Sequence, residues 1–206
     1  MIEVHHLNNS RSQRILWLLE ELGLEYEIVP YQRDAETNLA PESLRAIHPL
    51  GKSPVIRDGD RVAIESGAII DYLVRRRGGG RLAPPPSSPE YDLYQQWLHY
   101  AEGSAMLPLM LKLYLGRLGE AGAPLAPRVN SEIENHFGYL DSQLAARDFF
   151  VGDEFTAADI QLSFPIQAAR LLYGLGNFPR LAGFLERVTA RPAYRRALER
   201  GGPTIF

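Results

Sequence analysis

The chain has 206 residues, of which 45% are hydrophobic and 23% are charged, and its formal net charge is −3. This composition is typical of soluble globular proteins, and the small negative charge lacks the basic excess of nucleic-acid-binding proteins. Cysteine is absent, which excludes disulfides, cysteine-ligated zinc and a protein thiol as nucleophile. Because no apolar run is long enough to cross a bilayer and the N-terminus lacks a signal-peptide pattern, we expect a cytoplasmic protein that does not enter membranes.

Strand and helix patterns alternate in the first eighty residues. Ser10 and Gln13 match an S-x-x-Q capping box, so a helix should follow and end near Gly23. Residues 58–60, Asp-Gly-Asp, indicate a hairpin turn, and Ser66 can cap the next helix. In chain order, the predicted elements are a strand at 2–7, the first helix, a strand at 26–31, a short helix at 41–47, a hairpin of strands at 55–57 and 61–64, and the helix after Ser66.

The sharpest change in composition separates two predicted domains. Residues 80–89 combine glycine, proline and serine and are predicted to form a linker, which leaves domains at 1–79 and 90–206. The fold class expected is therefore an α/β domain of βαβαββα order followed by an all-α domain. In the second domain, a long helix is predicted to begin at a Ser87–Glu90 capping box, to run toward Leu118 and to be kinked at Pro108. Further helices are predicted at about 127–146 and from Thr156, and short ones near 179–189 and 192–199.

Thr156 and Asp159 are predicted to have a structural role at the start of one of these helices. Threonine as the N-cap with an acidic residue three positions later forms a capping box, and Phe155 and Ile160 occupy the hydrophobic staple positions. We expect this motif to support folding of the helical domain and to have no part in catalysis.

Four further sequence motifs occur in a recognisable order along the chain. They are Asn9-Ser10-Arg11-Ser12-Gln13-Arg14, Gly51-Lys52-Ser53-Pro54-Val55, Glu65-Ser66 and Gly152-Asp153-Glu154-Phe155-Thr156-Ala157-Ala158-Asp159. With these motifs, and with residues 14–23 as its first helix, the chain resembles the cytosolic glutathione S-transferase superfamily, in particular bacterial and fungal members with a serine-type active site. The resemblance covers nearly the full length. It implies a thioredoxin-like N-terminal domain, a helical C-terminal domain and a homodimer.

The resemblance implies a glutathione site in the first domain. Pro54 is expected to follow a cis peptide bond, which would present the N–H and C=O of Ser53 to the cysteinyl backbone of glutathione. Glu65 and Ser66 open a helix, so Ser66 can hold the γ-glutamyl carboxylate while Glu65 accepts from its ammonium group. The alternative for Ser66 is a plain helix cap. Lys52 can meet the glycyl carboxylate, or it is an ordinary surface lysine.

Ser10 is the candidate catalytic residue. It follows the first strand and lies four residues before Arg14, as the serine does in the serine-type members that the chain resembles. Its hydroxyl would donate a hydrogen bond to the sulfur of glutathione and stabilise the thiolate. The alternative is that Ser10 only caps the helix, in which case Ser12, Asn8 or Asn9 becomes the donor.

His5 and His6 lie on the first predicted strand, where the alternation of side chains sends them to opposite faces. Neither has a metal-ligating partner that the sequence identifies. They are therefore predicted to be structural or surface residues, and no metal is expected.

The resemblance places the acceptor-substrate site between the loop after the first strand and the first long helix of the second domain. Its candidate residues, any of which can equally be core residues, are Tyr100, Gly103, Ser104, Leu107, Met110 and Tyr114. The implied activity is conjugation of reduced glutathione, as co-substrate, to small apolar electrophiles. The alternatives are glutathione-dependent peroxidase activity at the same site and a non-catalytic, transferase-like scaffold for protein partners.

Overall fold

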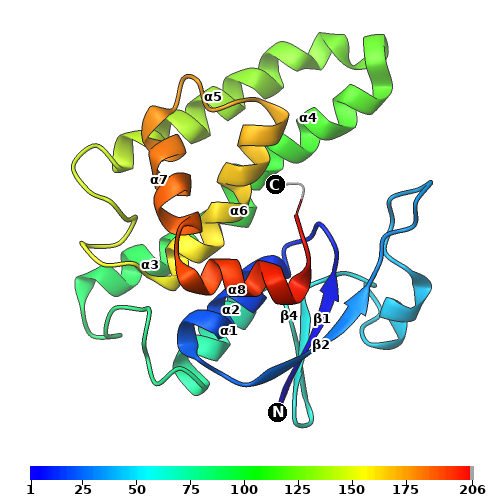
Figure 1. Ribbon diagram of the computed structural model, residues 1–206. Coiled ribbons are helices and arrows are strands. Elements are labelled where there is room, and N and C mark those ends of the chain that lie inside the picture. Colours follow the sequence, from blue (N-terminus) through cyan, green and yellow to red (C-terminus); the bar gives the residue numbers. More distant parts are fainter. Residues whose placement is uncertain (205–206) are drawn as a thin grey trace. The chain divides into compact units, whose positions relative to one another are not determined.

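In the computed structural model, which describes residues 1–204, the chain forms two compact units (Figure 1). The first comprises Met1–Leu82 together with the segment that begins at Ala190, and the second comprises Ala83–Thr189. The break after Leu82 falls inside the predicted linker. The C-terminal segment differs from the predicted domain ranges, because it packs with the first unit although the sequence places it in the helical domain.

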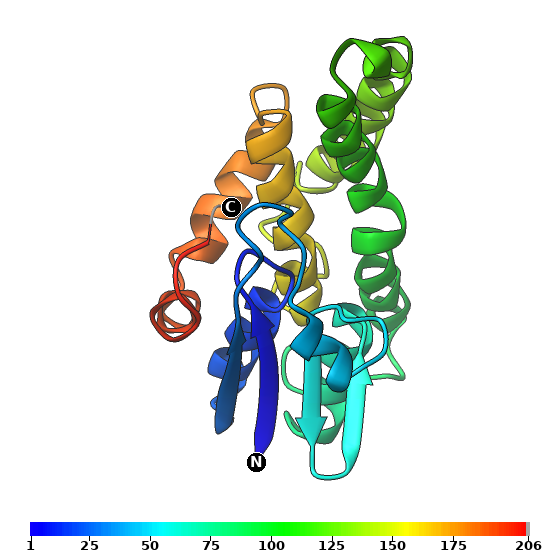
Figure 2. The ribbon, with the colours of Figure 1, turned by 90° about the vertical axis from the view of Figure 1, so that its right-hand side faces the viewer.

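The first unit is built around a mixed sheet with strand order β2-β1-β3-β4, whose strands lie side by side in Figure 2. β1 (Ile2–Leu7) runs parallel to β2 (Tyr26–Tyr31) and antiparallel to β3 (Val55–Asp58), which pairs with β4 (Arg61–Ile64). Pro30 lies on β2, an edge strand, where its missing N–H is tolerated. The predicted βαβαββα order is confirmed, and its helical members are α1 (Gln13–Leu22), the 3₁₀ helix η1 (Glu42–Ala46) and α2 (Ser66–Arg76).

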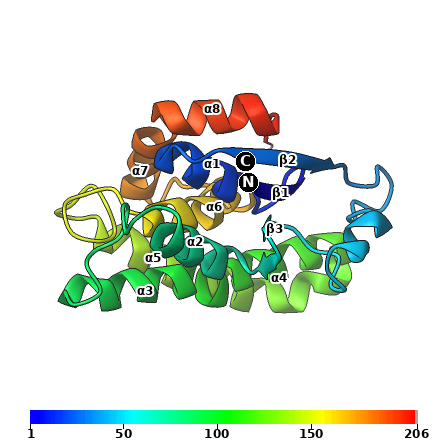
Figure 3. The same cartoon turned by 90° about the horizontal axis from the view of Figure 1, so that it is seen from below.

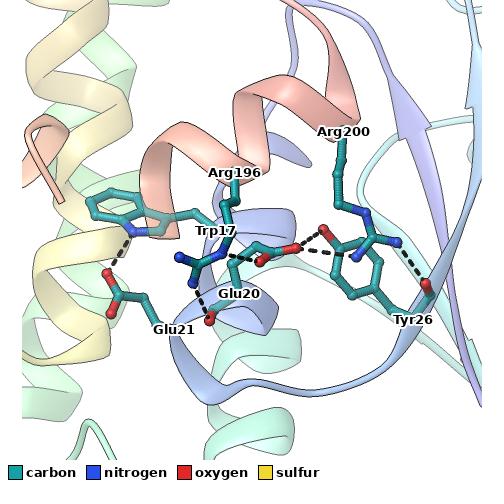
Figure 4. A network of polar contacts seen from close by, with 6 residues as sticks. All are labelled: Trp17, Glu20, Glu21, Tyr26, Arg196 and Arg200. Carbon is teal, nitrogen blue, oxygen red and sulfur yellow. Dashed lines mark hydrogen bonds and ion pairs between the residues drawn. The ribbon is translucent and has the colours of Figure 1, made fainter. Parts of the chain in front are cut away.

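The last helix, α8 (Pro192–Gly201), packs against α1 within the first unit, as Figures 1 and 3 show. The ring of Trp17 on α1 meets the ring of Tyr194 edge to face, with centroids 5.0 Å apart. Figure 4 shows the polar contacts around this helix pair. The ion pairs between the C-terminal segment and α1 are Arg191–Glu21 at 2.6 Å, Arg196–Glu20 at 2.8 Å and Arg200–Glu20 at 3.1 Å.

Two helix starts differ from the predicted capping boxes. α1 begins at Gln13 with Ser12 as its N-cap, so Ser10 and Gln13 do not form a box. The reason is a turn after β1, within which the Ser10 hydroxyl bonds to Ser12. The N-cap of α3 is Ser88, where the sequence pattern indicated Ser87.

Every element of the second unit is helical in the part of the chain that the structure describes. α3 (Pro89–Tyr100) continues through a π-helical turn, η2 (Ala101–Ala105), into α4 (Met106–Leu118). The π turn lies just before Pro108, which lacks the N–H that the carbonyl of Ser104 would accept from in an α-helix. Where the sequence predicts a kink, the structure therefore has a π turn. The other elements are the 3₁₀ helix η3 (Gly119–Leu125), α5 (Ala126–Gln143), α6 (Ala157–Leu172) and α7 (Pro179–Thr189).

The predicted capping box at α6 is confirmed and ties this helix to the core of the second unit. The side chain of Thr156 caps the helix, and the backbone N–H of Thr156 donates to Oδ2 of Asp159 at 2.7 Å. The other carboxylate oxygen accepts from the N–H of Phe150 at 2.9 Å. Phe150 in turn packs against Trp97, with ring centroids 5.3 Å apart. Asp159 is fully buried, and this burial raises its pKa to about 6.

Candidate active site

The predicted glutathione-binding residues come from three segments of the first unit, namely the loop after β1, the loop before β3 and the start of α2. Ser53 joins the first two segments, because its Oγ donates to the carbonyl of His5 at 2.9 Å and lies 3.5 Å from Oγ of Ser10. Arg14 joins α1 to α2 by donating to Oγ of Ser66 at 2.9 Å. The structure therefore links Ser10 to Ser53, and α1 to Ser66.

The peptide bond between Ser53 and Pro54 is cis, as predicted. Pro54 is buried, Ser53 is half-buried and Lys52 is exposed beside them. Within residues 1–204, the N–H and C=O of Ser53 form no backbone–backbone hydrogen bond. Both groups can therefore pair with the main chain of a ligand.

The start of α2 presents backbone N–H groups and two polar side chains. Glu65 precedes the helix with φ 66° and ψ 115°, a positive φ that is uncommon outside glycine and recurs at functional sites. The first intrahelical bond runs from the N–H of Ile69 to the carbonyl of Glu65, and the N-terminal end of such a helix favours an anion. Ser66 is buried and Glu65 is exposed. Arg14, which the sequence showed only as part of a motif, is itself buried and holds the Ser66 hydroxyl.

Ser10 and Ser12, the two hydroxyl candidates, differ in their access to solvent. Ser12 is fully buried, and its Oγ lies 2.8 Å from Nδ1 of His6. Ser10 keeps 7% of its surface exposed. Its Oγ lies 2.7 Å from Oγ of Ser12 and accepts from the Ser12 N–H at 3.2 Å. Of the two residues, Ser10 is therefore the more exposed.

The two asparagine candidates are held by Arg33, which the sequence did not single out. The backbone N–H of Arg33 donates to Oδ1 of Asn8 at 2.8 Å. Its guanidinium donates to the backbone carbonyls of Asn8 and Asn9, each at 3.2 Å. Arg33 follows β2, so it fixes the loop after β1 from the neighbouring strand. No local sequence pattern marks such a contact, because its partners are far apart along the chain.

Both histidines of β1 are buried, so of the two predicted alternatives the surface position is excluded and the structural one remains. His5 lies 2.9 Å from the hydroxyl of Tyr31 through its Nδ1. His6 contacts Ser12 through Nδ1, and its Nε2 lies 2.9 Å from the carbonyl oxygen of Gly201. Burial lowers the pKa of both rings, and for His5 the nearby Arg57 lowers the pKa further.

The acceptor candidates lie on α3, the π turn and α4 of the second unit. Tyr100 directs its hydroxyl to Nδ1 of His136 on α5, at 2.8 Å, and burial raises its pKa to about 12. Its hydroxyl is thus engaged within the helical unit. Leu107 and Tyr114 are 57% and 51% exposed. The remaining candidates are half-buried Ser104 and Met110 and exposed Gly103.

A cavity of about 510 Å³ lies between α4, η3 and α5, and none of these acceptor candidates lines it. In the described part of the chain, no group of three histidine, aspartate or glutamate side chains is placed to hold a metal ion. Among the helices of residues 1–204, none combines the length and apolar character needed to span a membrane.

The chain is similar to known proteins over nearly its whole length. The family "Glutathione S-transferase, N-terminal domain" matches residues 1–75, and "Glutathione S-transferase, C-terminal domain" matches residues 95–192. Glutathione S-transferase 1 of Saccharomyces cerevisiae is 33% identical, with 97% of this chain and 95% of the relative covered. Glutathione S-transferase 3 of Schizosaccharomyces pombe is 35% identical, with 97% and 88% covered.

Two solved structures extend the similarity to three dimensions. A glutathione S-transferase from Actinobacillus pleuropneumoniae has a TM-score of 0.91 and 35% identity, and the match covers 100% of this chain and 94% of that one. A glutathione transferase family member from Pseudomonas fluorescens, solved with two glutathione bound, has a TM-score of 0.80 and 29% identity, with 96% and 92% covered.

Proposed function

Because the chain belongs to the glutathione S-transferase family, we propose that it binds reduced glutathione in its first unit and conjugates it to small apolar electrophiles. The observation that carries this proposal is the approach of Ser10 to Ser53, whose side-chain oxygens lie 3.5 Å apart beside the cis peptide bond at Pro54. Glutathione paired with the main chain of Ser53 would carry its cysteinyl sulfur into the neighbourhood of the Ser10 hydroxyl.

The two ends of glutathione find complementary groups in this proposal. The γ-glutamyl carboxylate is bound by the N–H groups at the start of α2 and by Ser66, whose hydroxyl already accepts from Arg14 and can donate its own proton. Exposed Glu65 accepts from the γ-glutamyl ammonium group, and exposed Lys52 meets the glycyl carboxylate.

Ser10 is the proposed catalytic residue, and its role is to stabilise the thiolate. A free thiol has a pKa near 8.5, and lowering it by two units requires about 2.7 kcal/mol of thiolate stabilisation. A hydrogen bond from a hydroxyl to the charged sulfur, together with the N-terminus of α1, can supply this amount. A serine hydroxyl does not act as the base at neutral pH, so it contributes as a donor.

The second unit is proposed to contribute the acceptor site. Leu107 and Met110 of α4 and Ser104 of the π turn form this site, since they lie along one stretch of helix and Leu107 is largely exposed. The hydroxyl of Tyr100 is held by His136, so the part of Tyr100 in this site is its ring.

We further propose a homodimer in the cytoplasm, with no nucleic acid or membrane as partner and no metal. Family membership supports the dimer. The proposed use of reduced glutathione supports a cytoplasmic location, because the cytoplasm maintains glutathione as the thiol.

Retention on immobilised glutathione, followed by two activity assays, tests this function. We expect retention, elution by free glutathione and conjugation of 1-chloro-2,4-dinitrobenzene. Turnover with cumene hydroperoxide but not with the chlorinated aromatic would make the protein a glutathione peroxidase. Retention without turnover of either substrate would favour a non-catalytic scaffold, and failure to bind glutathione would refute the proposal.

A further inference from the structure

A continuous row of hydrogen bonds leads from Ser10 into the interior of the first unit. Oγ of Ser10 lies 2.7 Å from Oγ of Ser12, which lies 2.8 Å from Nδ1 of His6. The other ring nitrogen of His6, Nε2, lies 2.9 Å from the carbonyl oxygen of Gly201. The inner members of the row, Ser12 and His6, are buried, and Ser10 is its outer end.

The chemistry of the groups fixes the direction of these hydrogen bonds in the resting protein. The carbonyl of Gly201 can only accept, so Nε2 of His6 carries a proton and donates it. In a neutral imidazole the second nitrogen, Nδ1, is then an acceptor. It accepts the single proton of the Ser12 hydroxyl at 2.8 Å, a shorter contact than the 3.3 Å from this hydroxyl to the carbonyl of Leu7. Oγ of Ser12 therefore accepts from Ser10 at 2.7 Å, whereas the other acceptor near the Ser10 hydroxyl, Oγ of Ser53, lies 3.5 Å away. The Ser10 proton points inward, and its oxygen offers lone pairs to an incoming thiol.

This direction is opposite to the one that a thiolate needs. Stabilisation of a thiolate requires the Ser10 proton to point outward, toward sulfur. We propose that the proton lost by bound glutathione moves along this row to His6, which reverses the two hydrogen bonds between Ser10, Ser12 and His6 and leaves the one to Gly201 unchanged. The inference rests on the proposed function, since it needs glutathione at Ser10. His6 and Ser12 act through Ser10 and do not touch the substrate.

The transfer conserves every atom and charge. The S–H bond of glutathione breaks and its proton binds Oγ of Ser10, while the proton of Ser10 passes to Ser12 and that of Ser12 passes to Nδ1 of His6. The products are a thiolate that accepts from Ser10 and an imidazolium that donates to Ser12 and to Gly201. After the thiolate has attacked the electrophile and the leaving anion has departed, the imidazolium returns its proton to solvent by the same row.

The surroundings of His6 suit a proton acceptor. Burial lowers its pKa, which keeps the ring neutral in the free protein at pH 7, while the Gly201 carbonyl favours the imidazolium once sulfur is charged. Across the sheet, His6 lies opposite Pro30 of β2. The arginines on the helices near His6 bind other groups. Arg14 of α1 binds Ser66, and Arg196 and Arg200 of α8 both bind Glu20 of α1.

The position of the Gly201 carbonyl is fixed by the attachment of α8 to α1. Figure 4 shows Arg196 and Arg200 on the carboxylate of Glu20, and Arg200 also donates to the carbonyl of Tyr26 at 2.9 Å. Gly201 itself is tightly packed, because an added Cβ would lie 2.4 Å from a methyl carbon of Leu16. The inner end of the row is therefore anchored by the C-terminal helix.

A proton count on glutathione binding tests the relay. Glutathione is titrated into the full-length protein at pH 7 by calorimetry in buffers of different ionisation enthalpy, which gives the protons released. Ultraviolet absorbance gives the thiolate formed in the same samples. We expect the wild type to form thiolate with almost no proton release, because the proton stays on His6. Release of about one proton per thiolate by the wild type would overturn the proposal.

His6→Asn is the matching variant, because its side-chain oxygen can accept from Ser12 but cannot take up a proton. We expect it to release about one proton for each thiolate that it forms, and its kcat/KM profile to shift to higher pH by about one unit. The glutathione KM well below the thiol pKa should stay near the wild-type value. His5→Asn is the control, because His5 is equally buried on β1 but its side chain bonds to Tyr31, outside the row.

The outcomes separate the relay from the proposed function. Thiolate formation with the same proton count in wild type and His6→Asn overturns the relay alone, and glutathione conjugation stands. Absence of thiolate from the wild type refutes the proposed chemistry and the relay with it. If His6→Asn does not fold, the proton count of the wild type still decides.

Discussion

Truncation of Asp159 to alanine should destabilise the second unit without removing the chemistry. The carboxylate accepts from the backbone N–H groups of Phe150 at 2.9 Å and Thr156 at 2.7 Å, and Asp159 is fully buried. A buried donor left without its partner costs roughly 1–3 kcal/mol, and two are lost here, so we expect a loss of about 3 kcal/mol or more in the free energy of unfolding. Asp159→Asn should lose about half as much, because its side-chain oxygen can still accept one of the two bonds.

The two tryptophans allow the affected unit to be followed alone. Trp97 belongs to the second unit and donates to the carbonyl of Phe150 at 3.0 Å, while Trp17 belongs to the first. In a Trp17→Phe background, urea unfolding monitored by fluorescence therefore reports on the unit that contains Asp159. A loss below about 0.5 kcal/mol for Asp159→Ala would refute the reasoning, because surface substitutions have effects of that size. So would a fully stable variant with abolished turnover, which would make Asp159 functional.

The remaining predictions concern binding, the C-terminal helix and pH. Glu65→Ala or Ser66→Ala should raise the glutathione KM well before kcat falls, because these contacts are shared by ground and transition states, and an unchanged KM in both variants would remove the assignment. Glu20→Ala should destabilise the first unit by about 2 kcal/mol through its lost charged hydrogen bonds, whereas Glu25→Ala, an exposed control, should change stability little in urea unfolding. The pKa of Asp159, about 6, exceeds its ordinary value of 3.8, so protonation of this group adds a pH-dependent stabilisation that is complete below pH 3.8 and is lost as pH rises through 6. The wild type should therefore gain stability relative to Asp159→Asn when the pH falls from 7 to 5; the opposite trend would contradict the sign.

Local patterns predicted the elements that depend on local chemistry. The Asp-Gly hairpin turn, the edge strand that carries Pro30 and the capping box of Thr156 and Asp159 were all visible as short motifs, and the structure confirms them. The S-x-x-Q pattern at Ser10 failed, because a turn after β1 delays the helix and makes Ser12 the N-cap. A capping box identifies a residue type and a spacing, and the same spacing also fits a turn.

Contacts between distant segments could not be predicted in the same way. α8 is an amphipathic helix in a run of helices, and only its contacts in three dimensions, which include ion pairs with α1 and the packing of Tyr194 on Trp17, assign it to the first unit. One partner of His6, Ser12, lies in the turn after β1, and the other, Gly201, lies near the end of the described chain. Strand alternation predicted the face of the sheet on which His6 lies, but it predicted neither contact. Arg33 reaches back to Asn8 and Asn9 from the following strand, and its neighbours in sequence give no sign of that role.

The account depends most on the thiolate at Ser10, and titration of bound glutathione by its ultraviolet absorbance tests this most directly. The wild type should bind glutathione as a thiolate with a pKa about two units below the free value near 8.5. Ser10→Ala, shown to be folded by circular dichroism, should return the pKa toward the free value while glutathione affinity well below that pKa changes little. Identical titrations of the two proteins would contradict the account and leave Ser10 as a turn residue.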